Sequence, residues 1–146
     1  MDTMETTTAS QTERELLAEW KDLTAEFSRA QDRRTARLLN LIDQAIREQV
    51  PSATALELTV DPILDRDYAG RLADRILLGD GVSALAPSKI VAFRRQGATT
   101  IGYPTIVEMT VEHLLRQVVQ GGVASLSPYV KKGDRGEPVI PLGFTH

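Results

Sequence analysis

Residues 12–50 read TERELLAEWKDLTAEFSRAQDRRTARLLNLIDQAIREQV, and this stretch decides the fold. It contains no glycine and no proline, and it is rich in residue types that lose little on entering a helix. Thr12 is placed to cap its start, and Pro51 ends it. Such a helix is a rod of roughly 57 Å, whereas a compact chain of 146 residues has a radius of gyration of about 15 Å. The sequence therefore predicts a helix that is kinked, packs along a partner or projects from its domain.

The apolar residues of this helix change their spacing halfway along. The first four are spaced by four, three and four residues, which is typical of a coiled-coil seam. They are Leu16, Trp20, Leu23 and Phe27. Residues 28–37 are polar, and a wider apolar face of the kind that packs on a core follows them. Two interpretations stay open: a core helix with a solvated middle or a kink near Gln31, and a helix that pairs with itself or with a partner.

The composition is that of an ordinary globular domain. Hydrophobic residues make up 42% and charged residues 25% of the chain, both near average, and its length is typical of one domain. No apolar run approaches the roughly 18 residues of a membrane span, and the polar start lacks the pattern of a secretory signal. The chain is cysteine-free, which excludes disulfides and thiolate metal sites. We expect a cytoplasmic protein with no membrane partner and with a disordered polar tail over residues 1–11.

The segment after Pro51 predicts a small α+β core over residues 51–121. Alternating apolar residues predict a strand over residues 54–60. Residues 65–78 carry the spacing and the terminal signals of a helix. Residues 89–95 predict a second strand, for which residues 99–101 are a short candidate partner.

The segment from Thr105 onward leaves two interpretations open. Thr105 and Glu108 have the spacing of a capping box, which predicts a helix beginning there. The β-branched residues of the same segment instead favour a strand over residues 105–111, followed by a shorter helix. Residues 122–146 are rich in turns, and their prolines allow at most an edge strand. The predicted fold class is α+β: a long N-terminal amphipathic helix, then a small sheet with two further helices.

Basic residues gather in the second half of the chain. Residues 81–146 carry seven basic and four acidic residues, a net charge of +3, although the whole chain carries −3. Basic residues interleaved with aromatic ones are typical of a surface that binds nucleic acid. A nucleic-acid-binding or regulatory module is therefore the first alternative, on one exposed surface formed by Arg94, Arg95, Lys131, Lys132 and Arg135. The negative net charge of the chain argues against it.

Residues with catalytic or metal-binding chemistry are few. Asp61, Asp65 and Asp67 lie close in sequence but lack the spacing of a calcium loop. His113 is the only internal histidine, and no nucleophile or orienting partner is visible for it. A small metal-assisted enzyme built from these four residues is the second alternative. The sequence itself predicts no catalytic residue, no metal and no cofactor.

These observations favour a non-enzymatic function. We expect a protein-interaction or assembly module that acts through Leu16, Trp20, Leu23 and Phe27, because a large apolar stripe seldom stays exposed on a soluble monomer. The expected partner is either another protein or a second copy of the chain, which would make a homo-oligomer.

Overall fold

The computed structural model describes residues 2–97 and 105–143, with side chains described from Gln11 onward. The fold is α+β, as predicted, with a long N-terminal helix, a small antiparallel sheet and two further short α-helices. In chain order the elements are α1 (Asp2–Gln49), β1 (Ala53–Leu58), β2 (Ala73–Leu78), η1 (Pro87–Lys89), β3 (Val91–Gln96), β4 (Ile106–Thr110), α2 (Val111–Gln120), α3 (Val123–Leu126), η2 (Ser127–Tyr129), β5 (Lys131–Lys132) and β6 (Pro138–Pro141).

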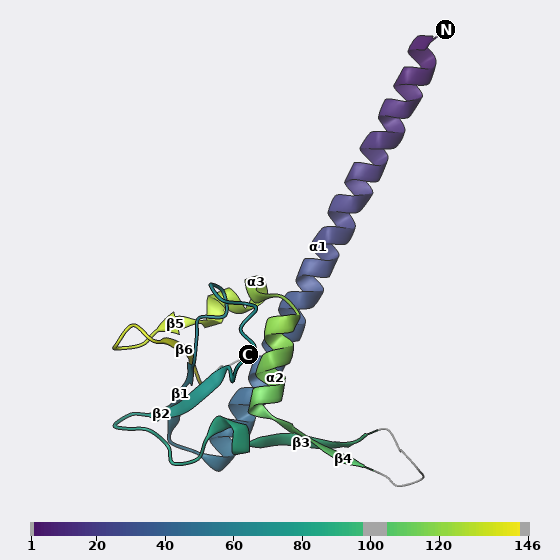
Figure 1. The fold of residues 1–146 in the computed structure, drawn as a ribbon. Helices are drawn as coiled ribbons and strands as arrows, with labels where there is room; N and C mark the ends of the chain where they lie inside the picture. The colour runs from purple at the N-terminus through teal and green to yellow at the C-terminus, as the bar shows by residue number, and fades with distance from the viewer. Residues whose placement is uncertain (1, 98–104, 144–146) are drawn as a thin grey trace.

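The first helix is one continuous element. α1 contains 48 residues, which corresponds to about 72 Å at 1.5 Å per residue. It passes through Gln31 without a break, so the alternative of a kink there is wrong. Figure 1 shows that its N-terminal part extends far beyond the rest of the molecule. Its bounds include most of residues 1–11, and the disorder expected of that tail stays a prediction.

Four strands form an antiparallel sheet in the order β2-β1-β6-β5. Leu56 of β1 lies opposite Ile76 of β2 on one side and Ile140 of β6 on the other. β6 also pairs with β5, so it lies inside the sheet, and the expectation of an edge strand at most in residues 122–146 is wrong. Pro138 and Pro141 are the first and last residues of β6, the positions at which a missing N–H disturbs a ladder least.

The helix predicted over residues 65–78 is wrong, because residues 73–78 form β2. Leu72, Ala73 and Ile76 are buried, but so few apolar residues fit a short strand as well as a helix. Pairing with β1 along its length decides in favour of the strand. The strand predicted over residues 54–60 is confirmed as β1, with shifted ends.

The interpretation of a strand before a shorter helix is confirmed for the segment after Thr105. Ile106–Thr110 is β4, which pairs with β3, and α2 begins at Val111. The strand predicted over residues 89–95 is confirmed as β3 with shifted ends, and residues 99–101 lie outside the described residues. β3 and β4 form a separate two-stranded ribbon that extends from the body (Figure 1).

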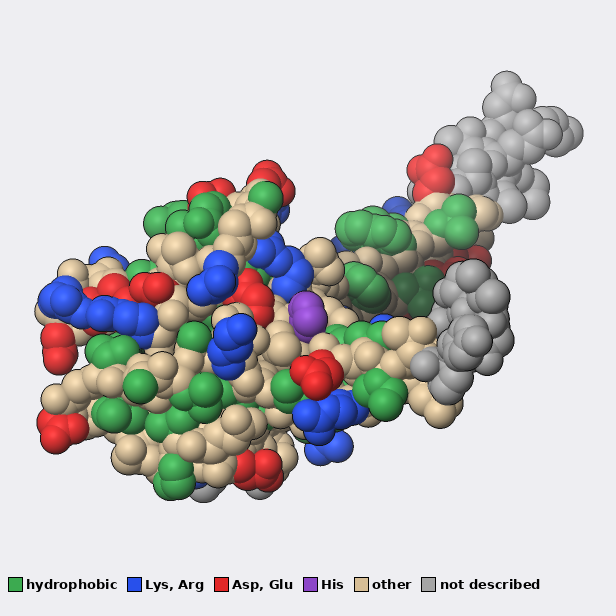
Figure 2. Space-filling model, turned by 60° about the horizontal axis from the view of Figure 1, so that its bottom comes forward, with side chains coloured by type: hydrophobic (Ala, Val, Ile, Leu, Met, Phe, Trp, Pro, Cys, Tyr) green, Lys and Arg blue, Asp and Glu red, His purple; other side chains and the backbone are tan. Residues whose placement is uncertain are grey.

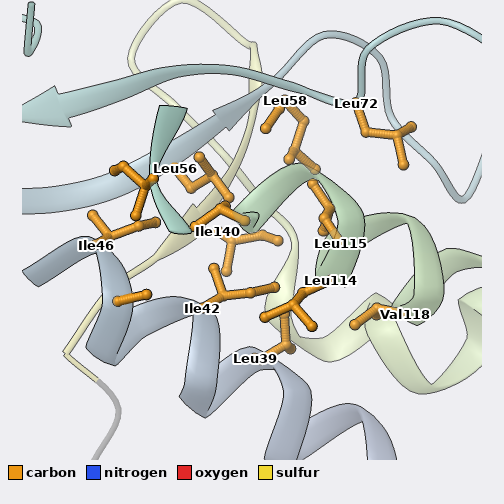
Figure 3. Close-up of a cluster of buried hydrophobic side chains, with 14 of the residues drawn as sticks. Leu39, Ile42, Ile46, Leu56, Leu58, Leu72, Leu114, Leu115, Val118 and Ile140 are labelled. Carbon is orange, nitrogen blue, oxygen red and sulfur yellow. The ribbon is translucent and has the colours of Figure 1, made fainter. Parts of the chain in front are cut away.

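The hydrophobic core lies between the C-terminal part of α1, α2 and the four-stranded sheet (Figure 3). Thr35 is the first buried residue along the described part of α1, at 2% exposed. The largest fully buried side chains come from all three layers, and they include Leu39, Ile42, Ile46, Leu56, Ile76, Leu114, Leu115 and Ile140. The second half of α1 is therefore a core helix, as its wider apolar face predicts.

Candidate functional site

The N-terminal part of α1 stands free of the body. Every residue from Gln11 to Ala30 is exposed, and these twenty residues make about 30 Å of helix. We call this segment the arm. Its most solvent-exposed large hydrophobic side chains are the four residues that the spacing singled out: Leu16 at 60%, Trp20 at 62%, Leu23 at 57% and Phe27 at 65% exposed. We call these four residues the stripe.

The stripe occupies a single face of the arm. Successive residues of a helix are rotated by about 100°, so spacings of four, three and four residues keep all four side chains within an arc of about 60°. Figure 2 shows hydrophobic side chains gathered on the helix where it leaves the body. Leu17, at 51% exposed, widens this apolar surface on one side. The arm therefore presents a continuous apolar face to solvent.

Polar side chains fix the arm where it meets the body. The Gln31 side-chain amide donates a hydrogen bond to the Gly121 carbonyl, and Arg34 Nη1 donates to the Gln117 carbonyl at 3.2 Å. Ser125 Oγ donates to Asp32 Oδ1 at 2.7 Å. We call these contacts the polar junction.

The Gln31 and Arg34 contacts lie at the C-terminal end of α2, where cations suit the helix dipole, and the Asp32 contact is with Ser125 of α3. The interpretation of residues 28–37 as a solvated middle is therefore wrong in part. Several of these polar residues attach α1 to the elements beside it. Because α1 is continuous through the junction, the direction of the arm is set by the body.

The five basic candidates are divided between two hairpins: Arg94 and Arg95 on β3, Lys131 and Lys132 on β5, and Arg135 between β5 and β6. β3 and β5 belong to separate sheets, and Figure 1 shows the two hairpins extending from the body in different directions. Arg94 Nε lies 3.2 Å from Glu108 Oε1, and Arg135 Nη2 lies 4.0 Å from Glu57 Oε2. Part of the positive charge is thus paired within the chain. Binding of nucleic acid stays a prediction.

Two residues of the proposed metal-assisted site, Asp61 and His113, have structural roles. Within the described residues, no three His, Asp or Glu side chains gather so that they could hold a metal ion. Asp61 Oδ1 accepts the Ile63 N–H at 3.0 Å in a turn. His113 Nδ1 accepts the Thr110 N–H at 3.3 Å, and Thr110 Oγ1 accepts the His113 N–H at 3.3 Å. This is the capping box of α2, five residues after the one expected at Thr105.

An ion pair on the sheet, between the buried Glu57 and the partly exposed Arg75, was not predicted from the sequence. Glu57 lies opposite Arg75 in the β1–β2 register, and Arg75 donates to both of its carboxylate oxygens, at 3.1 and 3.0 Å. The Arg75 guanidinium holds the pKa of the Glu57 carboxyl below its ordinary value. The signal in the sequence is a single charge among apolar residues of a strand, which does not identify its partner.

Glu112 is a second acid with an unexpected role. Its two carboxylate oxygens accept the N–H groups of Leu72 and Ala73 at 2.6 and 2.8 Å. Arg116, one turn later on α2, donates to the carbonyls of Tyr68 and Gly70. α2 therefore holds the loop that leads into β2. Glu112 does not share a helix face with Glu108, because Glu108 lies on β4.

Comparisons with known proteins identify no relative of this chain. No family model matches the sequence, and the searches of curated proteins and of solved structures give no significant match. Among the described residues, no helix combines the length and the apolar character needed to cross a membrane.

Proposed function

We propose that this chain is a protein-interaction or assembly module that binds a helical partner on the stripe. The proposal rests on the exposure of the stripe, whose four side chains are 57–65% exposed on one face of the helix. The helix extends beyond the rest of the domain over this segment. Contiguous exposed apolar surface of this kind is typical of interaction sites. Trp is among the residue types that most often anchor interfaces.

The shape of the arm favours a helical partner. The stripe is narrow and straight, and side chains at spacings of three and four residues pack between the side chains of a second helix or into an apolar groove. A stripe on a regular helix is also organised before binding, which lowers the entropy cost of association. Since the polar junction sets the direction of the arm, a partner bound there would have a defined position relative to the body.

Covering the stripe contributes favourable free energy to binding. A fully covered aromatic side chain removes about 150–250 Å² from water. At about 25 cal/mol per Å², Trp20 and Phe27 together contribute several kcal/mol before the costs of association. The two leucines add to this.

A pair of double variants tests the proposal. Trp20→Glu with Leu23→Glu places two charges on the stripe, and Ala18→Glu with Ala25→Glu places the same two charges on the opposite face of the arm. All four positions are exposed, so we expect both variants to keep the wild-type far-UV circular dichroism spectrum.

Immobilised wild type and the Ala18/Ala25 control should retain the same binding protein from an extract of the native host, identified by mass spectrometry and rebuilt from purified components. The Trp20/Leu23 variant should lose it. Equal retention by both variants contradicts the proposal, and so does a wild type that is monomeric and binds nothing.

A further inference from the structure

We infer that the partner of the stripe is a second copy of this chain, bound parallel and in register, so that two arms form a short coiled coil. This inference rests on the proposed function and names its partner. It follows from the residues that flank the stripe, from the position of the body around α1 and from the ends of the stripe.

The stripe fits the heptad positions of a two-stranded coiled coil. Trp20 and Phe27 occupy a positions, and Leu16 and Leu23 occupy d positions. A charged residue lies at each end of the seam along the helix. The a position before it is Glu13 and the a position after it is Arg34, and each would meet its own copy in a parallel pair. Pairing therefore covers about two heptads.

The flanking charges select the parallel orientation. The g positions beside the stripe are Glu19 and Glu26, whereas the matching e positions carry uncharged residues, among them Thr24 and Gln31. In a parallel pair each g residue faces an e residue of the other helix. Glu19 then faces Thr24 of the second copy, and the like charges that meet, at Glu13 and at Arg34, lie only at the two ends of the seam. In an antiparallel pair g positions face each other, so Glu19 would meet Glu26 twice.

The body leaves room for this arrangement. The buried residues Thr35, Leu39 and Ile42 lie about a quarter of a turn around α1 from the stripe. A twofold axis along the stripe therefore places the two bodies on opposite sides of the paired arms. The line of the stripe continues to Leu41, the next apolar a position, which is 41% exposed. Beyond the polar junction the body covers part of the same line, because Leu38 packs against the core and Ala45 is buried, so pairing is confined to the arm.

The size of the contact predicts a dimer that dissociates on dilution. Four aromatic side chains and four leucines from two arms remove on the order of 1,000 Å² from water. That is the lower end of specific interfaces. Sedimentation equilibrium from about 1 µM to about 1 mM should therefore show a monomer–dimer equilibrium.

Disulfide crosslinking between introduced cysteines reports the relative orientation of the two arms. No native cysteine can crosslink, because the chain contains none. In a parallel pair Leu16→Cys alone and Phe27→Cys alone each form disulfide-linked dimers under mild oxidation. In an antiparallel pair neither does so efficiently, and the mixture of the two variants gives the crosslink. Ala18→Cys, on the opposite face of the arm, is the matched control and should crosslink slowly.

Two substitutions at Thr24 test the charge argument. Thr24 is exposed, and in the parallel pair it faces Glu19 of the second copy. Thr24→Lys should tighten the dimer and Thr24→Glu should weaken it, each by about three- to tenfold in dissociation constant. Changes of the same sign in both variants overturn the parallel arrangement, as does a crosslink found only in the mixture.

A chain that stays monomeric over the whole concentration range overturns self-pairing. If the wild type then still retains a different protein through its stripe, the proposed function stands and only this inference fails. If the Trp20/Leu23 variant and the wild type behave alike in both experiments, both fail.

Discussion

Adjacent residues on α1 have opposite surroundings. Ile42 is 1% exposed and packs in the core, whereas Leu41 is 41% exposed on the line of the stripe. Thr35, in the segment interpreted as solvated, is 2% exposed. The spacing of apolar residues indicates the general direction of a buried face, but single positions at its margin depend on which elements pack there.

Truncating Ile42 and truncating Leu41 should have different effects on the free energy of unfolding. Ile42→Ala should lower the free energy of unfolding by about 2–5 kcal/mol, because it leaves a cavity in the core. Leu41→Ala, the matched control, should cost less than about 1 kcal/mol. Urea unfolding followed by far-UV circular dichroism measures both. Equal costs would show that this face of α1 is not oriented as described.

Glu112 of α2 and Glu108 of β4, four residues apart in the chain, should also differ in their effects on stability. Glu112→Gln removes the negative charge and one of the two oxygens that accept the Leu72 and Ala73 N–H groups. It should lower the free energy of unfolding by about 1–3 kcal/mol. Glu108→Gln removes one partner of an exposed pair with Arg94 and should change stability by less than about 1 kcal/mol. A larger loss at Glu108 in the same urea experiment would contradict the role given to Glu112.

The Glu57–Arg75 pair makes the stability of the protein depend on pH. The pKa of Glu57 is lowered from its ordinary value of 4.5, first by the hydrogen bond from Arg75. The stability it contributes is therefore fully present above pH 4.5 and is lost as the pH falls through the lowered pKa. Glu57→Gln should be less stable than wild type at pH 7, and the difference should shrink below pH 4.5. A difference that stays constant from pH 7 to about pH 3 would contradict this account.

At the scale of elements, the long pattern of α1 was predicted correctly, whereas the short pattern of residues 65–78 was assigned to the wrong element. The continuous α1 segment follows from its lack of glycine and proline, while the six residues of β2 carry too few apolar positions to distinguish strand from helix. The polar junction could not be predicted, because the partners of Gln31 and Arg34 lie 90 and 83 residues away. Local sequence shows a polar segment but not what it contacts.

The polar junction should hold the base of the arm. Arg34→Ala removes the hydrogen bond to the Gln117 carbonyl, and we expect faster amide hydrogen exchange over the turns of α1 around it, with unchanged exchange in the core. Arg33→Ala removes the same charge one position earlier and is the control. Equal exchange in the two variants would show that the junction does not secure the arm.

At the scale of the whole molecule, the central feature is an apolar face on a helix that extends beyond its domain. The stripe could be predicted from residue spacing alone. Its exposure could not, because the same spacing occurs on helices that bury such a face in their own core. What separates the two is where the body ends along α1, and that depends on the packing of α2, α3 and the sheet.

Quenching of Trp20 fluorescence by acrylamide tests the central claim most directly, because the chain contains a single tryptophan and it lies in the stripe. In a dilute monomer we predict strong quenching and emission typical of a solvated indole, since Trp20 is 62% exposed. As the concentration rises, or as the purified partner is added, quenching should fall and the emission should shift to shorter wavelength. A Trp20 that is already protected in the dilute monomer would contradict the account, as would one that stays equally accessible at every concentration and with every partner.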